Sequence, residues 1–115
     1  MFTFYHNPRC SKSRQALALL EEKGIALDVV RYLETPHNLT SLKSLLKKLG
    51  IPPRALLRTG EDAYKTLGLA NPALSDKALL EAMLEHPKLI ERPILSDNKR
   101  AVIGRPPERV LTLLK

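Results

Sequence analysis

The order of strand and helix signals up to residue 33 constrains the fold more than any other feature of the sequence. Residues 2–5 form a short aromatic-rich run that Pro8 interrupts, which is typical of a strand. Apolar residues then recur at helical spacing from Ser11 until Gly24, a typical C-cap residue. Residues 27–33 are apolar and contain two adjacent valines, which predicts a second strand. Strand, helix and strand over about thirty residues predict a βαβ unit with two parallel strands.

The middle of the chain shows helical periodicity and no convincing strand. Leucines on one face and lysines on the other mark the first predicted helix, which ends before Gly50. Ser75 is a typical N-cap residue for the last helix of this region, and Pro87 ends that helix. We therefore predict a helical insertion over about residues 38–90, with helices at residues 40–49, 53–58, 61–67 and 75–85.

Strand signals return after the insertion. Residues 93–95 and 100–103 are separated by the polar residues 96–99, which predicts a β-hairpin. A proline in the first turn then predicts a final helix over residues 106–114. The complete order is β-α-β, an all-helical insertion, and β-β-α. This connectivity predicts a thioredoxin-like α/β fold, with residues 1–115 forming a single domain.

Composition limits the classes of function. The formal net charge is +7, which suits either a nucleic acid or a small anionic ligand. We expect no nucleic-acid partner, because only two Phe, three Tyr and no Trp are available for base stacking. No apolar run approaches the ~20 residues that cross a bilayer, and the N-terminus lacks a secretory signal pattern. We therefore expect a cytoplasmic protein with no membrane partner.

Cys10 is the single cysteine and lies between the first predicted strand and helix. One interpretation is a small buried apolar side chain. The other is a nucleophile, because the unpaired N–H groups of a helix N-terminus favour the thiolate, as do the nearby cations Arg9, Lys12 and Arg14. Ser13 stands where a Cys-x-x-Cys motif has its second sulfur, so its hydroxyl can donate to the thiolate but cannot form a disulfide. Any redox cycle therefore needs an external thiol.

Two further residues of this loop have open assignments. His6 either donates to Cys10 and stabilises its anion or only ends the first strand. Asn7 shapes the turn through its side chain, and a second role in positioning His6 stays open. Neither residue identifies a site by itself.

The sequence His6-Asn7-Pro8-Arg9-Cys10-Ser11-Lys12-Ser13-Arg14 resembles the N-terminal signature of the glutaredoxin- and glutathione-dependent arsenate reductases, the ArsC/Spx family. Further motifs similar to those of this family follow in the same order and cover essentially the whole chain. They are Tyr32-Leu33-Glu34, Arg54-Ala55-Leu56-Leu57-Arg58, Tyr64-Lys65-Thr66-Leu67-Gly68-Leu69, His86-Pro87, Glu91-Arg92-Pro93-Ile94 and Gly104-Arg105-Pro106.

The resemblance implies that Cys10 attacks arsenate while Arg58, Arg92 and Arg105 hold the oxyanion. Two unit negative charges 4 Å apart repel by about 4 kcal/mol at an effective dielectric constant of 20, so a thiolate and an oxyanion need such cations. Arg54, one predicted helical turn from Arg58, is an alternative to it. The family also implies a cis peptide bond before Pro93. Supporting roles are expected for His6, Asn7, Ser13, Arg14 and Pro93.

The activity that the resemblance implies is reduction of arsenate to arsenite. Glutathione would be the reducing co-substrate and glutaredoxin a partner, with no bound cofactor and no metal. Two departures from the well-studied resistance enzymes are Ser11, where they have glycine, and the end of the chain at Lys115, without an additional tail. Two alternatives therefore stay open. One is a glutathione-linked thiol oxidoreductase with another substrate. The other is an Spx-type regulator that binds RNA polymerase, although Ser13 argues against an internal disulfide switch.

Overall fold

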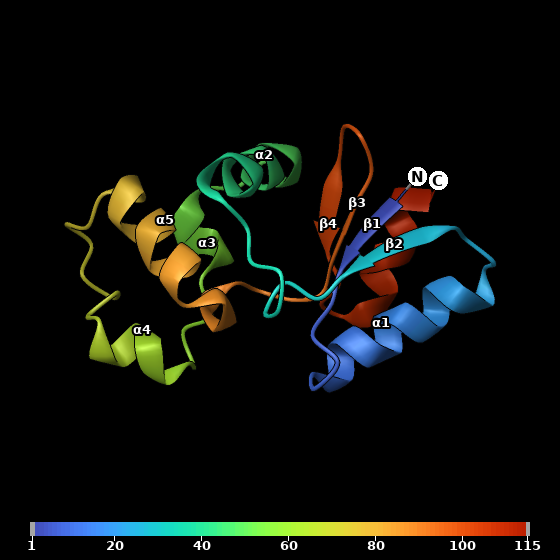
Figure 1. Ribbon diagram of the computed structural model, residues 1–115, viewed down its shortest axis with the longest axis horizontal. Helices are drawn as coiled ribbons and strands as arrows, with labels where there is room; N and C mark the ends of the chain where they lie inside the picture. Colours follow the sequence, from blue (N-terminus) through green and yellow to red (C-terminus); the bar gives the residue numbers. More distant parts are fainter. Residues whose placement is uncertain (1, 115) are drawn as a thin grey trace. The chain divides into compact units, whose positions relative to one another are not determined.

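The β-sheet is assembled from both ends of the sequence. The computed structural model describes residues 2–114. The strands lie in the order β2-β1-β3-β4, with β2 parallel to β1 and the other two pairs antiparallel. This topology is thioredoxin-like, as the order of sequence signals predicted (Figure 1). The strands are β1 (Phe2–Tyr5), β2 (Leu27–Val30), β3 (Ile94–Ser96) and β4 (Ala101–Ile103).

Two helices pack against the sheet. The α-helix α1 (Ser11–Glu22) begins at the predicted residue, and the chain leaves it through Gly24 at a φ of 68°, a conformation that favours glycine. The final helix, η2 (Pro107–Leu114), is a 3₁₀ helix and not the predicted α-helix. Together with β1 and β3 these helices bury one apolar core (Figure 1). Its buried members are Phe4, Ala16, Leu20, Leu95, Val110 and Leu113.

The chain divides into two compact units. The first combines the residues up to Thr35 with those from Arg92 onward and contains the sheet. The second spans residues 36–91, within two residues of the helical insertion that the sequence predicts. Among the described residues no helix is long and apolar enough to cross a membrane.

The second unit is built from short helices around buried leucines. Its first helix starts with a capping box between Asn38 and Ser41 and ends at Gly50, whose φ is 68°. Ser75 caps the last α-helix of the unit by accepting from the N–H of Ala78. The helices are α2 (Leu39–Leu49), α3 (Pro53–Leu56), α4 (Asp62–Thr66), α5 (Asp76–Glu85) and η1 (Pro87–Leu89).

Two elements end two or more residues earlier than predicted. Strand β2 ends at Val30 and not at residue 33, because the carbonyl of Arg31 accepts the N–H groups of the third and fourth residues after it and turns the chain. Helix α3 ends at Leu56 and not at Arg58. Leu57 instead forms an isolated antiparallel bridge with Ile90, so the prediction that Arg58 is helical is wrong.

Candidate active site

Cys10 is the N-cap residue of α1 and has an extended backbone conformation. The backbone N–H groups of Ser13 and Lys12, two of the donors that the first turn of a helix leaves unpaired, favour the anion of its sulfur. The thiol is partly exposed, so the interpretation of Cys10 as a buried apolar residue is wrong. A ready-made pair of backbone donors and access to solvent suit an anionic sulfur.

Strand pairing brings two arginines to this sulfur. Ile94 of β3 pairs with Ile103 of β4, and the N–H of Gly104 donates to the carbonyl of Pro93 at 2.8 Å. The same register places Arg92 opposite Arg105, just beyond the ends of the two strands. A cis peptide bond precedes Pro93, as the family resemblance implied, and a second one follows Arg105, which was not predicted.

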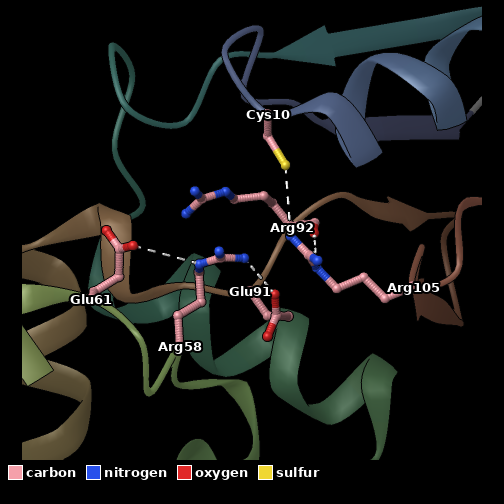
Figure 2. Close-up of polar contacts among 6 residues, drawn as sticks. All are labelled: Cys10, Arg58, Glu61, Glu91, Arg92 and Arg105. Carbon is pink, nitrogen blue, oxygen red and sulfur yellow. Dashed lines mark hydrogen bonds and ion pairs between the residues drawn. The ribbon is translucent and has the colours of Figure 1, made fainter.

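The guanidinium of Arg105 contacts both Cys10 and Arg92. Its Nε donates to the carbonyl of Arg92 at 2.8 Å, and its Nη2 donates to the sulfur of Cys10 at 3.6 Å. Figure 2 shows the Arg105 side chain reaching the sulfur. The Arg92 guanidinium adds a hydrogen bond and a full positive charge at the thiol. The unit that holds the sheet thus gathers Cys10, Arg92 and Arg105 into one cationic cluster.

The balance of these contacts favours the thiolate. Burial raises the pKa of the Cys10 thiol, but the N–H of Ser13, the hydrogen bond and charge of Arg92, and the N–H of Lys12 together lower it below its ordinary value. The cation that lowers this pKa is Arg92, which is remote in sequence. Lys12 lowers it through its backbone N–H and not through the ammonium charge that the sequence predicted.

Arg14 holds the loop. Its Nη1 donates to the carbonyl of Pro8 at 2.9 Å, which closes the turn that carries Cys10. The N–H of Cys10 donates to the carbonyl of Asn7 at 3.0 Å within the same turn, and the side chain of Asn7 accepts from the N–H of Arg9. Asn7 therefore shapes the turn through its side chain, as the sequence predicted.

His6 and Ser13 form a buried pair beneath the loop. The Nδ1 of His6 lies 2.6 Å from the hydroxyl of Ser13, which also accepts the N–H of Asn7 at 3.1 Å. His6 is 5% exposed and its ring lies 5.5 Å from that of Phe4. The Ser13 hydroxyl is thus engaged by the loop, and Ser13 reaches the sulfur through its backbone N–H rather than through the predicted hydroxyl. His6 contacts Ser13, a role that neither sequence interpretation contained.

Arg58 lies in the second unit, where carboxylates surround its guanidinium. Its Nη1 donates to Glu91 at 2.7 Å, and its Nε lies 4.0 Å from Glu61 (Figure 2). Arg54, the alternative to Arg58, donates to the carbonyls of Leu69 and of a neighbouring loop residue and so holds that loop. The assignment of Arg58 as an oxyanion ligand stays a prediction. Arg54 is the weaker candidate, because backbone carbonyls already accept from its guanidinium.

Sequence reasoning missed the two carboxylates. Glu91 lies in one of the family motifs, directly before Arg92, but no role was predicted for it. Glu61 was predicted only as the first residue of a helix. The available signal was their charge: each lies close in sequence to a predicted anion-binding arginine. In residues 2–114 no group of three or more His, Cys, Asp or Glu side chains is placed to hold a metal ion.

The chain has a thioredoxin-like fold with Cys10 at the start of its first helix. Comparison with known proteins shows the family to which it belongs. The ArsC family model matches residues 5–113, and the chain belongs to the ArsC family.

Individual relatives agree with this placement. The chain is 53% identical over 111 residues to the arsenate reductase of Neisseria meningitidis, covering 96% of this chain and 95% of that protein. It is 50% identical over 111 residues to the arsenate reductase of Haemophilus influenzae, covering 96% of each. A solved structure described as the arsenate reductase from Vibrio cholerae superposes with a TM-score of 0.93 at 54% identity, covering 96% of this chain and 95% of that one.

Proposed function

We propose that this protein is an arsenate reductase whose nucleophile is Cys10. The single observation that carries the proposal is the environment of the Cys10 sulfur, which lies at the start of α1 and accepts a guanidinium donor from Arg105. The N–H groups of Ser13 and Lys12 and the guanidinium of Arg92 outweigh burial and lower the pKa of Cys10, and the thiolate is the nucleophilic form. The names of the relatives point to arsenate as the oxidant that this thiolate attacks.

The arginines serve the substrate as well as the sulfur. A thiolate that approaches a mono- or dianion meets one or two repulsions of about 4 kcal/mol each at 4 Å and an effective dielectric constant of 20. Guanidinium groups offset this repulsion and bind two oxygens at once. Arg92 and Arg105 stand beside the sulfur. Arg58 completes the proposed set of oxyanion ligands.

The reaction starts when the sulfur of Cys10 attacks arsenic. One arsenate oxygen takes up protons and leaves as water, so that a Cys10–S–As(V) bond replaces an As–O bond. A glutathione thiolate then attacks at sulfur, and the electron pair of the S–As bond stays on arsenic. Arsenic is reduced from As(V) to As(III) and leaves as arsenite, while Cys10 and glutathione are oxidised to a mixed disulfide. Alternatively, glutathione attacks arsenic first and sulfur is attacked afterwards. The net two-electron reduction of As(V) to As(III) is the same in both cases.

Regeneration needs a further thiol, because the chain has one cysteine and Ser13 in place of a second. In the proposed cycle a glutaredoxin thiolate attacks the glutathione sulfur of the mixed disulfide and releases Cys10 as a thiolate. The glutathionylated glutaredoxin is then reduced by free glutathione. Turnover of the purified protein with thioredoxin and its reductase alone would contradict this part of the proposal.

Alkylation of Cys10 tests the proposal most directly. The rate of iodoacetamide modification is measured from pH 5 to pH 10, with and without arsenate, and Cys10→Ser serves as the blank. We expect fast modification at pH 6–7 that arsenate slows, and steady-state arsenate reduction with glutathione and glutaredoxin. A thiol-like midpoint near ~8.5 without protection by arsenate would contradict the proposal. Activity on a glutathionylated peptide but none on arsenate would favour the alternative oxidoreductase.

A further inference from the structure

Two carboxylates contact the same guanidinium in the helical unit, and their geometry differs. Glu91 makes a short charged hydrogen bond, with 2.7 Å between its Oε1 and the Nη1 of Arg58. Glu61 lies 4.0 Å from the Nε of Arg58, which is an ion-pair distance but too long for a hydrogen bond. Figure 2 shows the two acids on different nitrogens of the arginine. They can therefore act on it in different ways.

Backbone pairing fixes the contact with Glu91. The bridge between Leu57 and Ile90 is framed by two hydrogen bonds, Arg58 N–H to the carbonyl of Leu89 at 2.7 Å and Glu91 N–H to the carbonyl of Leu56 at 2.9 Å. Leu57 and Ile90 are buried, so the alternation of an extended chain turns the next residue of each segment away from that core. Arg58 and Glu91 are these next residues, diagonal neighbours within reach of long side chains.

The contact with Glu61 has no comparable support. Glu61 is the N-cap residue of α4, yet its side chain makes no cap hydrogen bond. Its carboxylate instead lies beside Arg58, across a turn in which the N–H of Glu61 donates to the Arg58 carbonyl at 3.4 Å. The Nε of Arg58 is buried and has no hydrogen-bond partner among residues 2–114. A buried donor in this condition is costly until an acceptor arrives.

We propose that Glu91 is a positioning residue that fixes Arg58 for oxyanion binding and that Glu61 is a placeholder carboxylate which the oxyanion displaces. With Nη1 held by Glu91, the edge formed by Nε and Nη2 is the one left for two oxygens of a tetrahedral oxyanion, the bidentate geometry that guanidinium groups favour. Glu61 balances the charge of this edge before the oxyanion binds. The inference rests on the proposed function, because it takes arsenate as the oxyanion that Arg58 binds.

Three variants separate the two roles by their effects on the KM for arsenate. Glu61→Gln removes the competing charge, and we expect KM to fall about threefold to fivefold, the range of a weak ion pair. Glu91→Ala releases Nη1, and we expect KM to rise about tenfold with kcat within about twofold. Glu91→Gln keeps an amide oxygen that accepts from Nη1, so it is expected to restore KM to within about threefold of the wild-type value.

Two controls separate a positioning effect on KM from effects of lost charge and of misfolding. Glu81→Gln removes an exposed carboxylate from α5 of the same unit and is expected to leave KM unchanged. Thermal melts show whether Glu91→Ala is folded, and Glu91→Gln carries the test if it is not. Protection of Cys10 from alkylation by arsenate gives the affinity independently of turnover.

The outcomes distinguish this inference from the proposed function. A wild-type protein that neither reduces arsenate nor is protected by it overturns both. If the wild type does both, an unchanged or raised KM in Glu61→Gln overturns the placeholder role. Equal effects of Glu91→Ala and Glu91→Gln overturn the positioning role.

Discussion

The Nε of Arg105 donates to the backbone carbonyl of Arg92 at 2.8 Å, so the guanidinium of one arginine is held by the main chain of the other. The same guanidinium also donates to the sulfur of Cys10 through Nη2. Two donors on one rigid plane link the hairpin to the cysteine loop. The geometry depends on the fork of arginine and not only on its charge.

Replacing Arg105 by lysine tests this dependence. A lysine ammonium keeps the charge but cannot reach the Arg92 carbonyl and the sulfur in the same fixed geometry. We expect kcat/KM for arsenate to fall about 10- to 100-fold, the equivalent of one charge-assisted hydrogen bond of ~1.5–3 kcal/mol. Steady-state kinetics with saturating glutathione measures it. A lysine variant with wild-type kcat/KM would mean that charge alone suffices.

The pKa of Cys10 should respond to Arg92 and not to the side chain of Lys12. Arg92 contributes both a hydrogen bond and a charge, whereas Lys12 contributes a backbone N–H that alanine retains. We therefore expect Arg92→Ala to raise the pKa of Cys10 and Lys12→Ala to leave it in place. Thiolate absorbance against pH gives both values. A larger rise in Lys12→Ala than in Arg92→Ala would restore the sequence-based interpretation of local cations.

The lowered pKa of Cys10 also makes stability depend on pH. A group whose pKa is lower in the folded state stabilises the fold above its unfolded pKa, and this contribution is lost as the pH falls through the folded pKa. The free energy of unfolding should therefore rise with pH from the folded pKa of the thiol up to its unfolded pKa. Cys10→Ser should remove this rise in urea titrations. An identical pH dependence in the variant would contradict the lowered pKa.

Acid should destabilise the protein through His6. Burial, followed by the charges of Arg31 and Arg14, lowers the pKa of His6, while Glu21 opposes them. As the pH falls, His6 is protonated in the unfolded chain before it is protonated in the folded protein. The contribution of neutral His6 to the free energy of unfolding is therefore complete above about pH 6.5 and is lost as the pH falls through the folded pKa.

Substitution of His6 and Ser13 tests this expectation. His6→Gln should reduce the loss of stability in acid. Part of this loss should remain because of His37, since burial lowers the pKa of His37 as well. Ser13→Ala should cost ~1–3 kcal/mol at any pH, because it leaves His6 and the Asn7 N–H without their buried partner. Chemical denaturation between pH 4 and pH 8 measures both effects. An undiminished acid loss in His6→Gln would contradict the assignment.

Gly104 should not tolerate a side chain. A Cβ there would lie 2.8 Å from Cγ of Pro93 and 2.9 Å from Cγ1 of Val110, so the Pro93 ring and the Val110 side chain of η2 would have to shift. We expect Gly104→Ala to cost ~1–3 kcal/mol of stability and to displace the segment that carries Arg92. Thermal melts and arsenate kinetics check the two effects. A fully stable and fully active variant would show that the packing here relaxes freely.

The strands and helices followed from local pattern because apolar periodicity and caps are local properties. Ser11 and Ser75 were recognised as helix starts in this way. The bridge of Leu57 with Ile90 could not be predicted, because it depends on two segments 33 residues apart that meet only in the folded unit. That bridge ends α3 early and moves Arg58 out of a helix.

In the candidate site, too, the local features could be predicted and the contacts between remote segments could not. The position of Cys10 at a helix N-terminus was predictable from the order of a strand, a loop and a helix. The dominance of Arg92 over the neighbouring cations was not, because side chains adjacent in sequence can point to solvent while strand pairing brings remote ones to the sulfur. The contact of Glu91 with Arg58 was missed for the same reason, because these two residues are 33 positions apart in the sequence.

Arg54 and Arg58 lie four residues apart, and their guanidinium groups have different partners. Arg54 donates to the carbonyls of Leu69 at 2.8 Å and Asn71 at 2.9 Å, so Arg54→Ala should lower stability and speed hydrogen exchange near these residues. The KM for arsenate should stay within about twofold, because backbone carbonyls occupy both terminal nitrogens. Arg58→Ala should instead raise KM by about tenfold or more, because the proposed oxyanion ligand is lost. Parallel kinetics and hydrogen exchange on the two variants check the division. A rise in KM confined to Arg54→Ala would exchange the roles of the two arginines.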